Sequence, residues 1–483
     1  MNKITYALLG MAAVVFVGCA DLDYNEASNR DEDWTYNSPL NGVKALVYDV
    51  YAQMPSEFKD DSYGNGALIA SATDESEFAL SFSPIHKYFN GGWTPSNPFS
   101  TTWDRSYRAI TQVHMYLERI HKIDLSDYKY DPDYQTMVQQ FEIFPYELRF
   151  LRTYFYFELV RAYGDVPLVT TTLTNEQANS VERTPAKDVF KFIINELDAV
   201  AEYLPVSYND IPGQEIGRAT RGAALALKAR VLLYQASPLF NTDNNKELWK
   251  EAAAASKVII DNAQRWGYKL SEYAKLWGHD TFTNSEFIFV LGTQASNTFE
   301  QYNYPVGVEN GNSGNCPTQA LVDAYEYQAD GKTFKEKHPG DVDVTTENPY
   351  DGLDPRFELT VVKNGDLWPS NTTQQIAIET YQSGFNGAPK YGATPTGYYL
   401  KKFVDGNCVT TANNRHNWIV MRLAEVYLNY AEAMYNYYSN ADEQGDFGMS
   451  ANEAINVLRN RPDIMMPEFQ GNNGFEERYM RER

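Results

Sequence analysis

Residues 219–236, with the sequence ATRGAALALKARVLLYQA, constrain the fold of this chain more than any other segment. Ala and Leu fill most of these positions and polar side chains are few, so a helix formed here has to be packed on most of its sides. The small Ala side chains let neighbouring helices approach closely. Pro238 then stops the helix. The segment therefore predicts a helix in the interior of a helical scaffold.

The helical period of apolar residues recurs on both sides of this segment. Further helices are expected at residues 40–53, 101–122, 137–163, 185–203, 246–262, 418–438 and 450–461. Antiparallel pairs of this size predict stacked helical hairpins of tetratricopeptide type, although no clean repeat of about 34 residues is present. We predict a mostly α fold, in which helical hairpins form a scaffold and long irregular loops with few short strands carry the ligand site.

Long segments rich in Gly, Asn, Pro and Tyr separate the expected helices, notably residues 64–97, 278–317 and 330–397. Loops of this length in a compact protein are usually either functional or disordered. Their content of Trp, Tyr and Asn argues for function, because disordered segments are poor in aromatic residues.

The charge of the chain bears on its partners. A formal net charge of −23 repels phosphate backbones and therefore argues against nucleic acid as a partner. Such a surface suits a neutral or cationic ligand, although solubility alone explains it equally well. Aromatic residues make up 14% of the chain, with Tyr the most frequent. Tyr and Trp combine a flat apolar face with a polar tip, which suits neutral amphipathic ligands, but many of these side chains are also expected to pack between helices.

The N-terminus reads as a secretory signal peptide, residues 1–18, whose uncharged stretch is shorter than the roughly 20 residues that span a bilayer. It ends at Cys19, after a small residue, and so resembles the lipobox of bacterial lipoproteins, in which the cysteine thiol is acylated. The alternative is a soluble secreted protein. Residues 19–39 are polar and acidic and are expected to form a flexible tether. Asp21 and Asp23 resemble the acidic signal that directs Bacteroidetes lipoproteins to the outer leaflet.

Several segments, in the same order along the chain, resemble the SusD/RagB family, the surface lipoproteins of Bacteroidetes that sit on a TonB-dependent transporter. The resembling stretches are LRTYFYFELVRAYGDVPLV, GRATRGAALALKARVLLYQASPLFN, PTQALVDAYE, DPRF and NWIVMRLAEVYLNYAEAM, which begin near residues 148, 217, 317, 354 and 417. Together with the lipobox they cover nearly the whole chain.

The resemblance implies that residues 40–483 form a single SusD-like body, with a helical scaffold and a loop-rich ligand-binding lobe. It also implies a lipid-anchored, surface-exposed outer-membrane protein without catalytic activity, which captures an oligosaccharide and delivers it to a SusC-like TonB-dependent transporter. Family members continue beyond a sequence like Arg481-Glu482-Arg483, so the resemblance leads us to expect that the C-terminus is truncated.

The loops supply candidate ligand-binding residues. Trp93 lies in a Gly- and Pro-rich loop, and an exposed Trp can cover the C–H face of a sugar ring while Asn90 and Asp74 meet its hydroxyl rim. Aromatic residues of two other loops are further candidates: Tyr302, Tyr304 and Trp368. For each aromatic residue, packing in a core is the alternative to ligand contact.

The sequence offers little for catalysis or metal binding. No His pair has HExxH spacing and no GxSxG is present, so we expect no cofactor and no catalytic site. The pairs Asp74-Glu75 and Asp351/Asp354 could serve a glycosidase, but acidic pairs also arise by chance on a surface. A structural calcium ion in the Asp-rich segment 341–354 is conceivable.

Three other functions stay open as alternatives. They are a peptide binder of the RagB type, a surface glycosidase, and a scaffold that binds no small ligand. A deep polar groove would favour peptide, and a shallow platform of exposed aromatic rings would favour glycan. Cys316 and Cys408 could form a disulfide or remain buried thiols.

Overall fold

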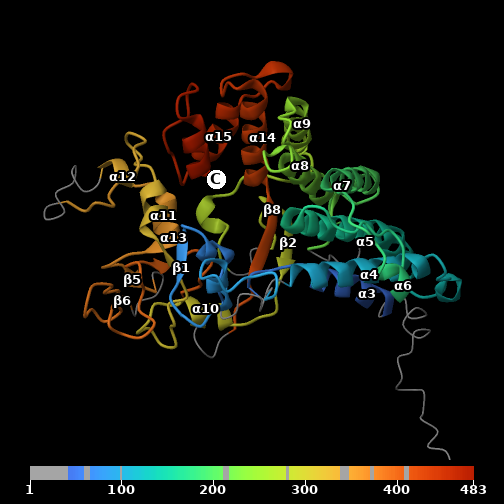
Figure 1. Ribbon diagram of the computed structural model, residues 1–483, viewed down its shortest axis with the longest axis horizontal. Coiled ribbons are helices and arrows are strands. Elements are labelled where there is room, and N and C mark those ends of the chain that lie inside the picture. The colour runs from blue at the N-terminus through green and yellow to red at the C-terminus, as the bar shows by residue number, and fades with distance from the viewer. Residues whose placement is uncertain are drawn as a thin grey trace, which may run out of the picture.

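The computed structural model describes residues 42–58, 66–97, 101–209, 211, 217–278, 282–337, 347–369, 375–406 and 413–483. The expected signal peptide, Cys19 and the tether lie outside these residues, as does Cys408. The described residues form a stack of long helices, here the helical scaffold, beside a region of short elements and loops, here the loop lobe (residues 66–97 and 293–416, apart from the gaps given above) (Figure 1).

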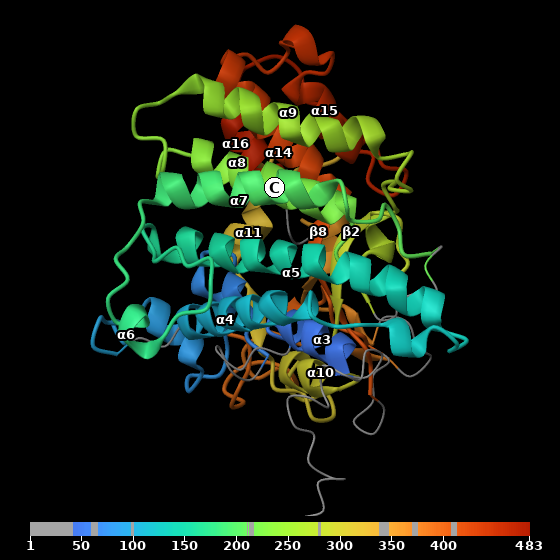
Figure 2. The same cartoon turned by 90° about the vertical axis from the view of Figure 1, so that its right-hand side faces the viewer.

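Successive helices of the scaffold lie side by side, as Figure 2 shows for α4, α5, α7, α8 and α9. The stack continues from α9 to α14 and from α14 to α15. The prediction of a mostly α fold built from helical hairpins of tetratricopeptide type is therefore confirmed. The helices are α3 (Lys44–Ala52), α4 (Thr102–Ile120), α5 (Tyr134–Tyr163), α6 (Asn175–Ala178), α7 (Ala186–Ala201), α8 (Arg221–Ala236), α9 (Lys246–Asn262), α14 (Leu423–Tyr438), α15 (Ala451–Arg459) and α16 (Phe475–Glu482).

Helix α8 occupies the interior of the stack, as its composition predicts. It begins where the Thr220 hydroxyl accepts a hydrogen bond from the backbone N–H of Ala223. Ala223, Ala224 and Leu227 are fully buried, and α8 contacts both α7 and α9. Large side chains of α5 complete the core, among them Phe150, Phe155 and Phe157.

The expected helix over 418–438 is wrong in its first turn. Residues 417–422 form strand β8 (Asn417–Arg422), which pairs antiparallel with β2 (Phe287–Gly292), and α14 begins only at Leu423. The apolar run Trp418–Met421 fits either a helix or a strand, and pairing with an equally apolar partner strand decides for the strand. This two-stranded sheet lies between the scaffold and the loop lobe (Figure 1).

The loop lobe contains short elements around several small apolar cores. Its strands pair as β1 with β3, β4 with β7, and β5 with β6. The bounds are β1 (Ser76–Phe78), β3 (Asn315–Pro317), β4 (Val361–Val362), β5 (Leu367–Trp368), β6 (Ile376–Ala377), β7 (Tyr399–Leu400), α10 (Thr298–Asn303), α11 (Gln319–Ala324), α12 (Phe334–Lys337) and α13 (Pro355–Thr360). Single turns of 3₁₀-helix occur in both regions: η3 (Ile69–Ala72), η4 (Pro84–Tyr88), η5 (Ser126–Tyr128), η6 (Tyr273–Lys275) and η7 (Gly445–Phe447).

Helix α16 was not expected from the sequence, and it connects the two regions. The Glu482 carboxylate accepts hydrogen bonds from Arg459 of α15 at 2.7 Å and from Arg356 of α13. Arg459 also contacts Glu326 of the loop lobe at 2.7 Å. The Glu482 and Arg459 side chains are almost fully buried. A buried network of charges therefore joins the end of the described chain to the loop lobe.

No helix among the described residues is both long enough and apolar enough to cross a membrane.

Candidate functional site

The loop that carries Trp93 is built to display side chains. Ser83 accepts a hydrogen bond from Ile85 N–H at 3.4 Å and starts η4, and Gly91 then turns the chain with a positive φ. The Asn90 side-chain oxygen accepts a hydrogen bond from Gly92 N–H at 2.8 Å, which leaves Asn90 exposed but committed to the shape of the loop.

Trp93 is placed as the sequence predicts. Its side chain is 45% exposed and meets the Tyr88 ring edge-on, with the ring centroids 5.0 Å apart. Asn97 donates from its side chain to the Gly92 carbonyl at 2.9 Å and so closes the loop around Trp93. The role of Asn97 was missed, although Asn after a Gly-rich turn is a usual residue for such closure.

Further exposed aromatic residues lie in the same segment of the chain as Trp93 and in a segment next to it. The side chains of Phe82 and Phe89 are 61% and 59% exposed, so most of each ring lies outside any apolar core. A Cβ on Gly392 would lie 3.6 Å from Leu80, so the exposed Tyr391 and Phe82 belong to adjacent segments. We call Phe82, Phe89, Trp93 and Tyr391 the aromatic surface. Phe82, Phe89 and Tyr391 were missed, although an aromatic residue in a polar loop is a signal that could have found them.

Tyr302 of α10 comes close to the aromatic surface. It is half-buried and packs, together with Tyr88, on the small core of Ala67, Phe78, Leu80 and Ile85. Asp74 is exposed but lies at the other end of the β1–β3 pair, where its carbonyl accepts a hydrogen bond from the Thr318 hydroxyl. The structure thus brings Trp93, Asn90 and Tyr302 to one region and leaves Asp74 apart from them.

Tyr304 and Trp368 occupy a different position from the one their loops suggest. They are 7% and 2% exposed, and their rings meet edge-on at 5.4 Å in a core that also holds Cys316. The Tyr304 hydroxyl donates to the Asp405 carbonyl. For these two residues the structure therefore shows the packing alternative, because neither ring has a face open to a ligand.

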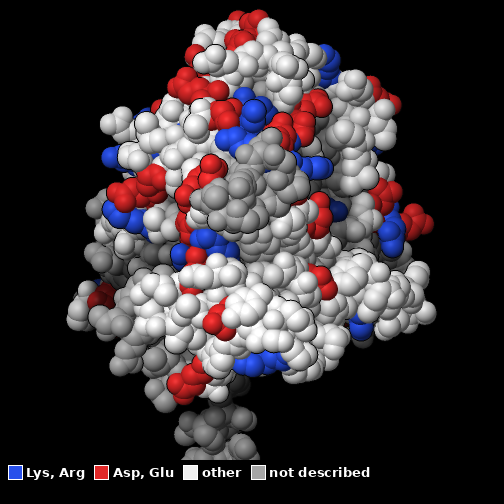
Figure 3. Space-filling model, turned by 90° about the vertical axis from the view of Figure 1, so that its left-hand side faces the viewer, with Lys and Arg blue, Asp and Glu red and all other residues white. Residues whose placement is uncertain are grey.

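The face of the molecule formed by the loop lobe carries few charges in its lower half. Figure 3 shows charged side chains gathered in the upper half of this face, above a broad area of uncharged residues. The overall charge of −23 is therefore not concentrated on that area. An uncharged, partly aromatic surface is suited to a neutral ligand.

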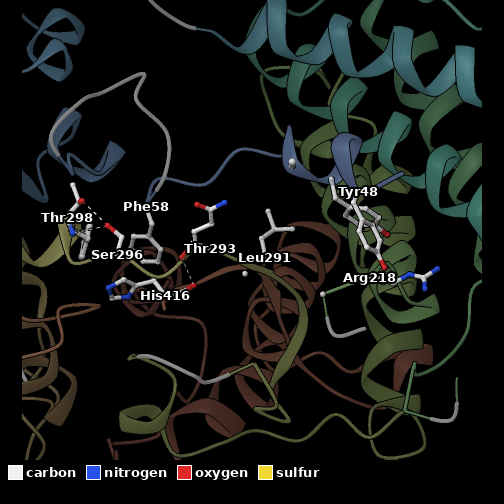
Figure 4. A pocket seen from close by; sticks show the side chains of 14 residues that line it. Tyr48, Phe58, Arg218, Leu291, Thr293, Ser296, Thr298 and His416 are labelled. Carbon is white, nitrogen blue, oxygen red and sulfur yellow. Dashed lines mark hydrogen bonds between the residues drawn. The ribbon is translucent and has the colours of Figure 1, made fainter. Parts of the chain in front are cut away.

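A cavity of about 900 Å³ lies elsewhere, where the scaffold meets the loop lobe (Figure 4). Tyr48 and Arg218 lie at one end of it, Phe58 and Thr298 lie at the other, and residues 291–296 run between them. The lining is Tyr48, Tyr51, Ala52, Phe58, Gly217, Arg218, Leu291, Gly292, Thr293, Gln294, Ser296, Thr298, Phe299 and His416. No sequence signal indicated this cavity, because its walls come from segments that are far apart in the chain.

A buried ion pair lies at one end of the cavity, and a buried hydrogen-bonded pair lies at the other. Arg218 donates to the fully buried Glu147 carboxylate, with Nε and Oε2 3.1 Å apart, and lies 4.5 Å above the Tyr208 ring. At the other end, His416 Nε2 and Glu300 Oε1 are 2.6 Å apart and both side chains are buried. Burial raises the pKa of Tyr48 to about 12, so its hydroxyl stays protonated at neutral pH.

Two of the acidic residues considered for catalysis or calcium, Asp351 and Asp354, have structural partners. Asp354 caps α13 by accepting from Arg356 N–H at 2.9 Å, and Asp351 accepts from the Asn348 side chain at 2.7 Å. Residues 341–346 of the candidate calcium segment lie outside the described residues. Within the described part of the chain, no three His, Cys, Asp or Glu residues gather as metal ligands would. Cys316 is a free, buried thiol.

Comparison with known proteins identifies relatives of the whole chain. Residues 285–483 match the family described as the SusD family, and residues 22–233 match the family described as starch-binding, associating with the outer membrane. A SusD-like protein of Formosa agariphila is 22% identical over 192 residues, which span 40% of this chain and 32% of that relative. The chain thus spans about a third of the length of this curated relative.

Solved structures share the fold over most of the chain. A SusD-like protein from Bacteroides fragilis NCTC 9343 superposes with a TM-score of 0.74 at 25% identity, covering 94% of this chain and 84% of that one. A SusD-like carbohydrate-binding protein from the same strain superposes with a TM-score of 0.73 at 25% identity, covering 93% and 83%. The matched segments, the helical scaffold and the loop lobe together show that this chain belongs to the SusD/RagB family.

Proposed function

We propose that this protein captures a neutral oligosaccharide at the surface of the outer membrane and delivers it to a SusC-like TonB-dependent transporter. The aromatic surface is the observation that carries this function. Phe82, Phe89 and Tyr391 are more than half exposed, and Trp93 is 45% exposed. A sugar ring offers one C–H face that stacks on such rings, while its hydroxyls meet polar groups at the rim.

The names of the matched proteins support the ligand class. One of the similar structures is described as a carbohydrate-binding protein, and one matching family is described as starch-binding. Asn90 lies in the same loop as Trp93, and the half-buried Tyr302 packs on the same small core as Tyr88, so both stay predictions for contact with the sugar hydroxyls. Asp74 also stays a prediction, for a ligand long enough to pass the end of the β1–β3 pair.

Binding is tested by gel retardation and calorimetry with the purified protein and a panel of neutral polysaccharides. We expect one polysaccharide to bind, and we expect Trp93→Ala to weaken it at least 10-fold, which is about 1.4 kcal/mol. The matched control is Tyr130→Ala, which removes an 87% exposed aromatic ring from the loop between α4 and α5. Binding of peptides alone would move the function to the RagB-type peptide binders, and release of reducing ends would show a glycosidase.

The membrane anchor is tested separately from the ligand. We propose that acylation of Cys19 holds the protein on the outer membrane, because several acyl chains together anchor a protein far better than one. Cys19→Ala is expected to move the protein from the membrane fraction to the soluble fraction, without a change in glycan affinity. Retention of the variant in the membrane fraction would contradict the lipid anchor.

The transporter partner is tested by co-purification from outer membranes. We expect the protein to carry a TonB-dependent barrel with it, because the family to which it belongs is described as associating with the outer membrane. Trp93→Ala should still co-purify with the barrel, since the aromatic surface is assigned to the ligand. Loss of the barrel in this variant would instead assign the aromatic surface to the transporter.

A further inference from the structure

We infer that the cavity between the scaffold and the loop lobe is a second binding site, for the end of a neutral oligosaccharide chain. None of the residues that line it belongs to the aromatic surface. The ligand class rests on the proposed function, whereas the existence of a second site rests on the cavity itself. Its volume of about 900 Å³ lies near the upper end of the range of roughly 300–1,000 Å³ that is usual for ligand sites.

The walls of the cavity combine aromatic rings with hydroxyl and amide groups, which suit the C–H face and the hydroxyl groups of a sugar. Tyr48 and Phe58 are half-buried aromatic residues at the two ends, so each keeps part of its ring open. Three other rings, Phe299, Phe403 and Trp418, support Phe58 edge-on, with centroid distances of 4.8, 5.4 and 5.3 Å. This support fixes the Phe58 ring before any ligand arrives, which lowers the entropy cost of binding.

Hydroxyl and amide groups line the stretch between the aromatic ends. The Ser296 hydroxyl donates to the Thr298 hydroxyl at 2.8 Å, and Thr293 donates to the His416 carbonyl at 2.8 Å (Figure 4). A hydroxyl that donates one hydrogen bond keeps lone pairs that can accept another from a ligand. Gln294 adds an exposed amide with both donors and an acceptor.

The charges of the cavity argue against an ionic ligand. Arg218 already faces the buried Glu147 carboxylate, and His416 already faces the buried Glu300 carboxylate. A charged ligand would have to leave water and then compete with a partner in place, which costs several kcal/mol per ion. A neutral chain of hydroxyl groups meets no such penalty.

A peptide is less suited to the same walls. An extended peptide gains affinity by hydrogen bonds to a free strand edge. Here the backbone of residues 293–296 already bonds to residues 414–416, with Ser296 N–H donating to Asn414 at 2.7 Å and Thr293 N–H to His416 at 3.2 Å. The backbone N–H groups of Thr293 and Ser296 are therefore not available to pair with a peptide strand.

Helix α10 places the cavity close to the aromatic surface. Its first residues, Thr298 and Phe299, line the cavity, and Tyr302 one turn later packs on the core beneath the aromatic surface. One turn of α10 therefore connects a wall of the cavity to the small core on which Tyr88, the ring neighbour of Trp93, also packs.

Calorimetry with short neutral oligosaccharides tests this site. The probes are trisaccharides derived from starch and laminarin, with an acidic trisaccharide of galacturonic acid as the charged comparison. Wild-type protein is expected to bind two molecules of one neutral trisaccharide, and the acidic trisaccharide at least 10-fold more weakly at the cavity. Thr298→Trp, which places a large ring at one end of the cavity, should remove one of the two sites, and Phe58→Ala should weaken the same site.

The controls separate the cavity from the aromatic surface. Thr242→Trp is the matched control. Thr242 is exposed in the turn after the C-terminal end of α8, whereas the cavity residue Arg218 lies just before the N-terminal end of that helix. Trp93→Ala should remove the other site and leave the cavity site intact. Thermal unfolding confirms that each variant is folded.

Each possible outcome decides between the two proposals. One site that is lost in Trp93→Ala and unaffected by Thr298→Trp and by Phe58→Ala would overturn the cavity and leave the proposed function standing. One site that is lost only in the cavity variants would support the cavity and overturn the aromatic surface. Equal losses in Thr298→Trp and Thr242→Trp would overturn the cavity, and no binding of any oligosaccharide would overturn both.

Discussion

In helix α5 of the scaffold, Phe150, Phe155 and Phe157 are buried, whereas in the loop lobe Phe82 and Phe89 are more than half exposed. The same side chain thus stabilises one region and covers the surface of the other. Burying a Phe stabilises a fold by about 1.5–3 kcal/mol, a gain that an exposed Phe forgoes. Buried Phe side chains therefore stabilise the scaffold, whereas the exposed rings of the loop lobe remain open to a ligand.

The two regions also differ in how they are held. The scaffold has two large apolar cores, one that spans α3 to α8 and reaches β2 and β8, and one formed by α8, α9, α14, α15 and α16. The loop lobe has several small cores and relies on buried charges, such as the Arg356–Glu482–Arg459 network, to stay attached to the scaffold. Variants that affect one kind of contact and spare the other can break or sharpen this comparison.

The largest effect is expected for Glu482→Ala. The change leaves Arg356 and Arg459 buried with one fewer carboxylate, and breaking a buried ion pair usually costs about 3–5 kcal/mol. Urea unfolding measures the loss in the free energy of unfolding. The matched control on the same helix is Glu477→Ala, whose pair with Arg481 is exposed and should cost less than about 1 kcal/mol. Equal effects of the two variants would show that the network does not attach the loop lobe.

A somewhat smaller effect is expected for Leu227→Ala in α8. Leu227 is fully buried in the scaffold core, and such a truncation leaves a cavity that costs about 3 kcal/mol. Leu239→Ala is the control, because Leu239 is 75% exposed just after the same helix and should change stability by less than about 0.5 kcal/mol. A loss in Leu227→Ala below that of the control would contradict a tightly packed scaffold.

A pH effect of about 1 kcal/mol is expected from His114 in α4, after allowance for solvent screening. Burial, together with Arg152, lowers the pKa of His114 to about 4, whereas an unfolded chain has a His pKa of about 6.5. Between these values the unfolded state binds a proton that the folded state does not, so stability falls as the pH falls from 6.5 toward 4. His114→Gln cannot take up this proton, so the difference in urea midpoint between pH 7 and pH 5 should shrink. An unchanged difference would assign the acid sensitivity to other groups.

The smallest effect on stability is expected for Trp93→Ala. Its half-exposed ring contributes little to any core, so the free energy of unfolding should change by less than about 0.5 kcal/mol even though glycan binding is lost. Thermal unfolding of the two proteins side by side measures this. A loss of several kcal/mol would place Trp93 with Tyr304 and Trp368 as a packing residue.

The sequence predicted the scaffold helices well where a regular apolar period and a helix cap were both present. The helix expected over 246–262 has the bounds of α9, because its apolar face repeats regularly and a capping Asn precedes it. The prediction was wrong for the first turn of the helix expected over 418–438, since an apolar run of four residues carries no period that separates strand from helix. Pairing with β2, more than a hundred residues earlier, decided the outcome.

The candidate site could be predicted only in part. Exposure of Trp93 was predicted because a Gly- and Pro-rich loop gives a Trp little to pack against, and Trp93 is 45% exposed. Its contact with a ligand stays a prediction. Trp368 shows the packing alternative, because its loop folds back over a small core. Burial of a loop residue depends on contacts that are distant in sequence, and a local pattern does not contain them. The cavity was missed for the same reason, because Tyr48, Arg218 and His416 meet only in the folded chain.

The pairing of β2 with β8 has a consequence for how this protein family can diversify. The chain leaves the scaffold at Gly292 and returns at Asn417, and these two residues are opposite one another in the sheet. Residues 293–416 therefore form an insertion, and the strand pairing holds its two ends next to each other. Because doubling the length of such an insertion costs only about 0.6 kcal/mol in closure entropy, loops can be lengthened, exchanged or grafted there while the helices stay as they are. Tyr391 and the cavity residues within 293–299 lie in this insertion, so this part of the ligand-facing surface can change without a change in the helices.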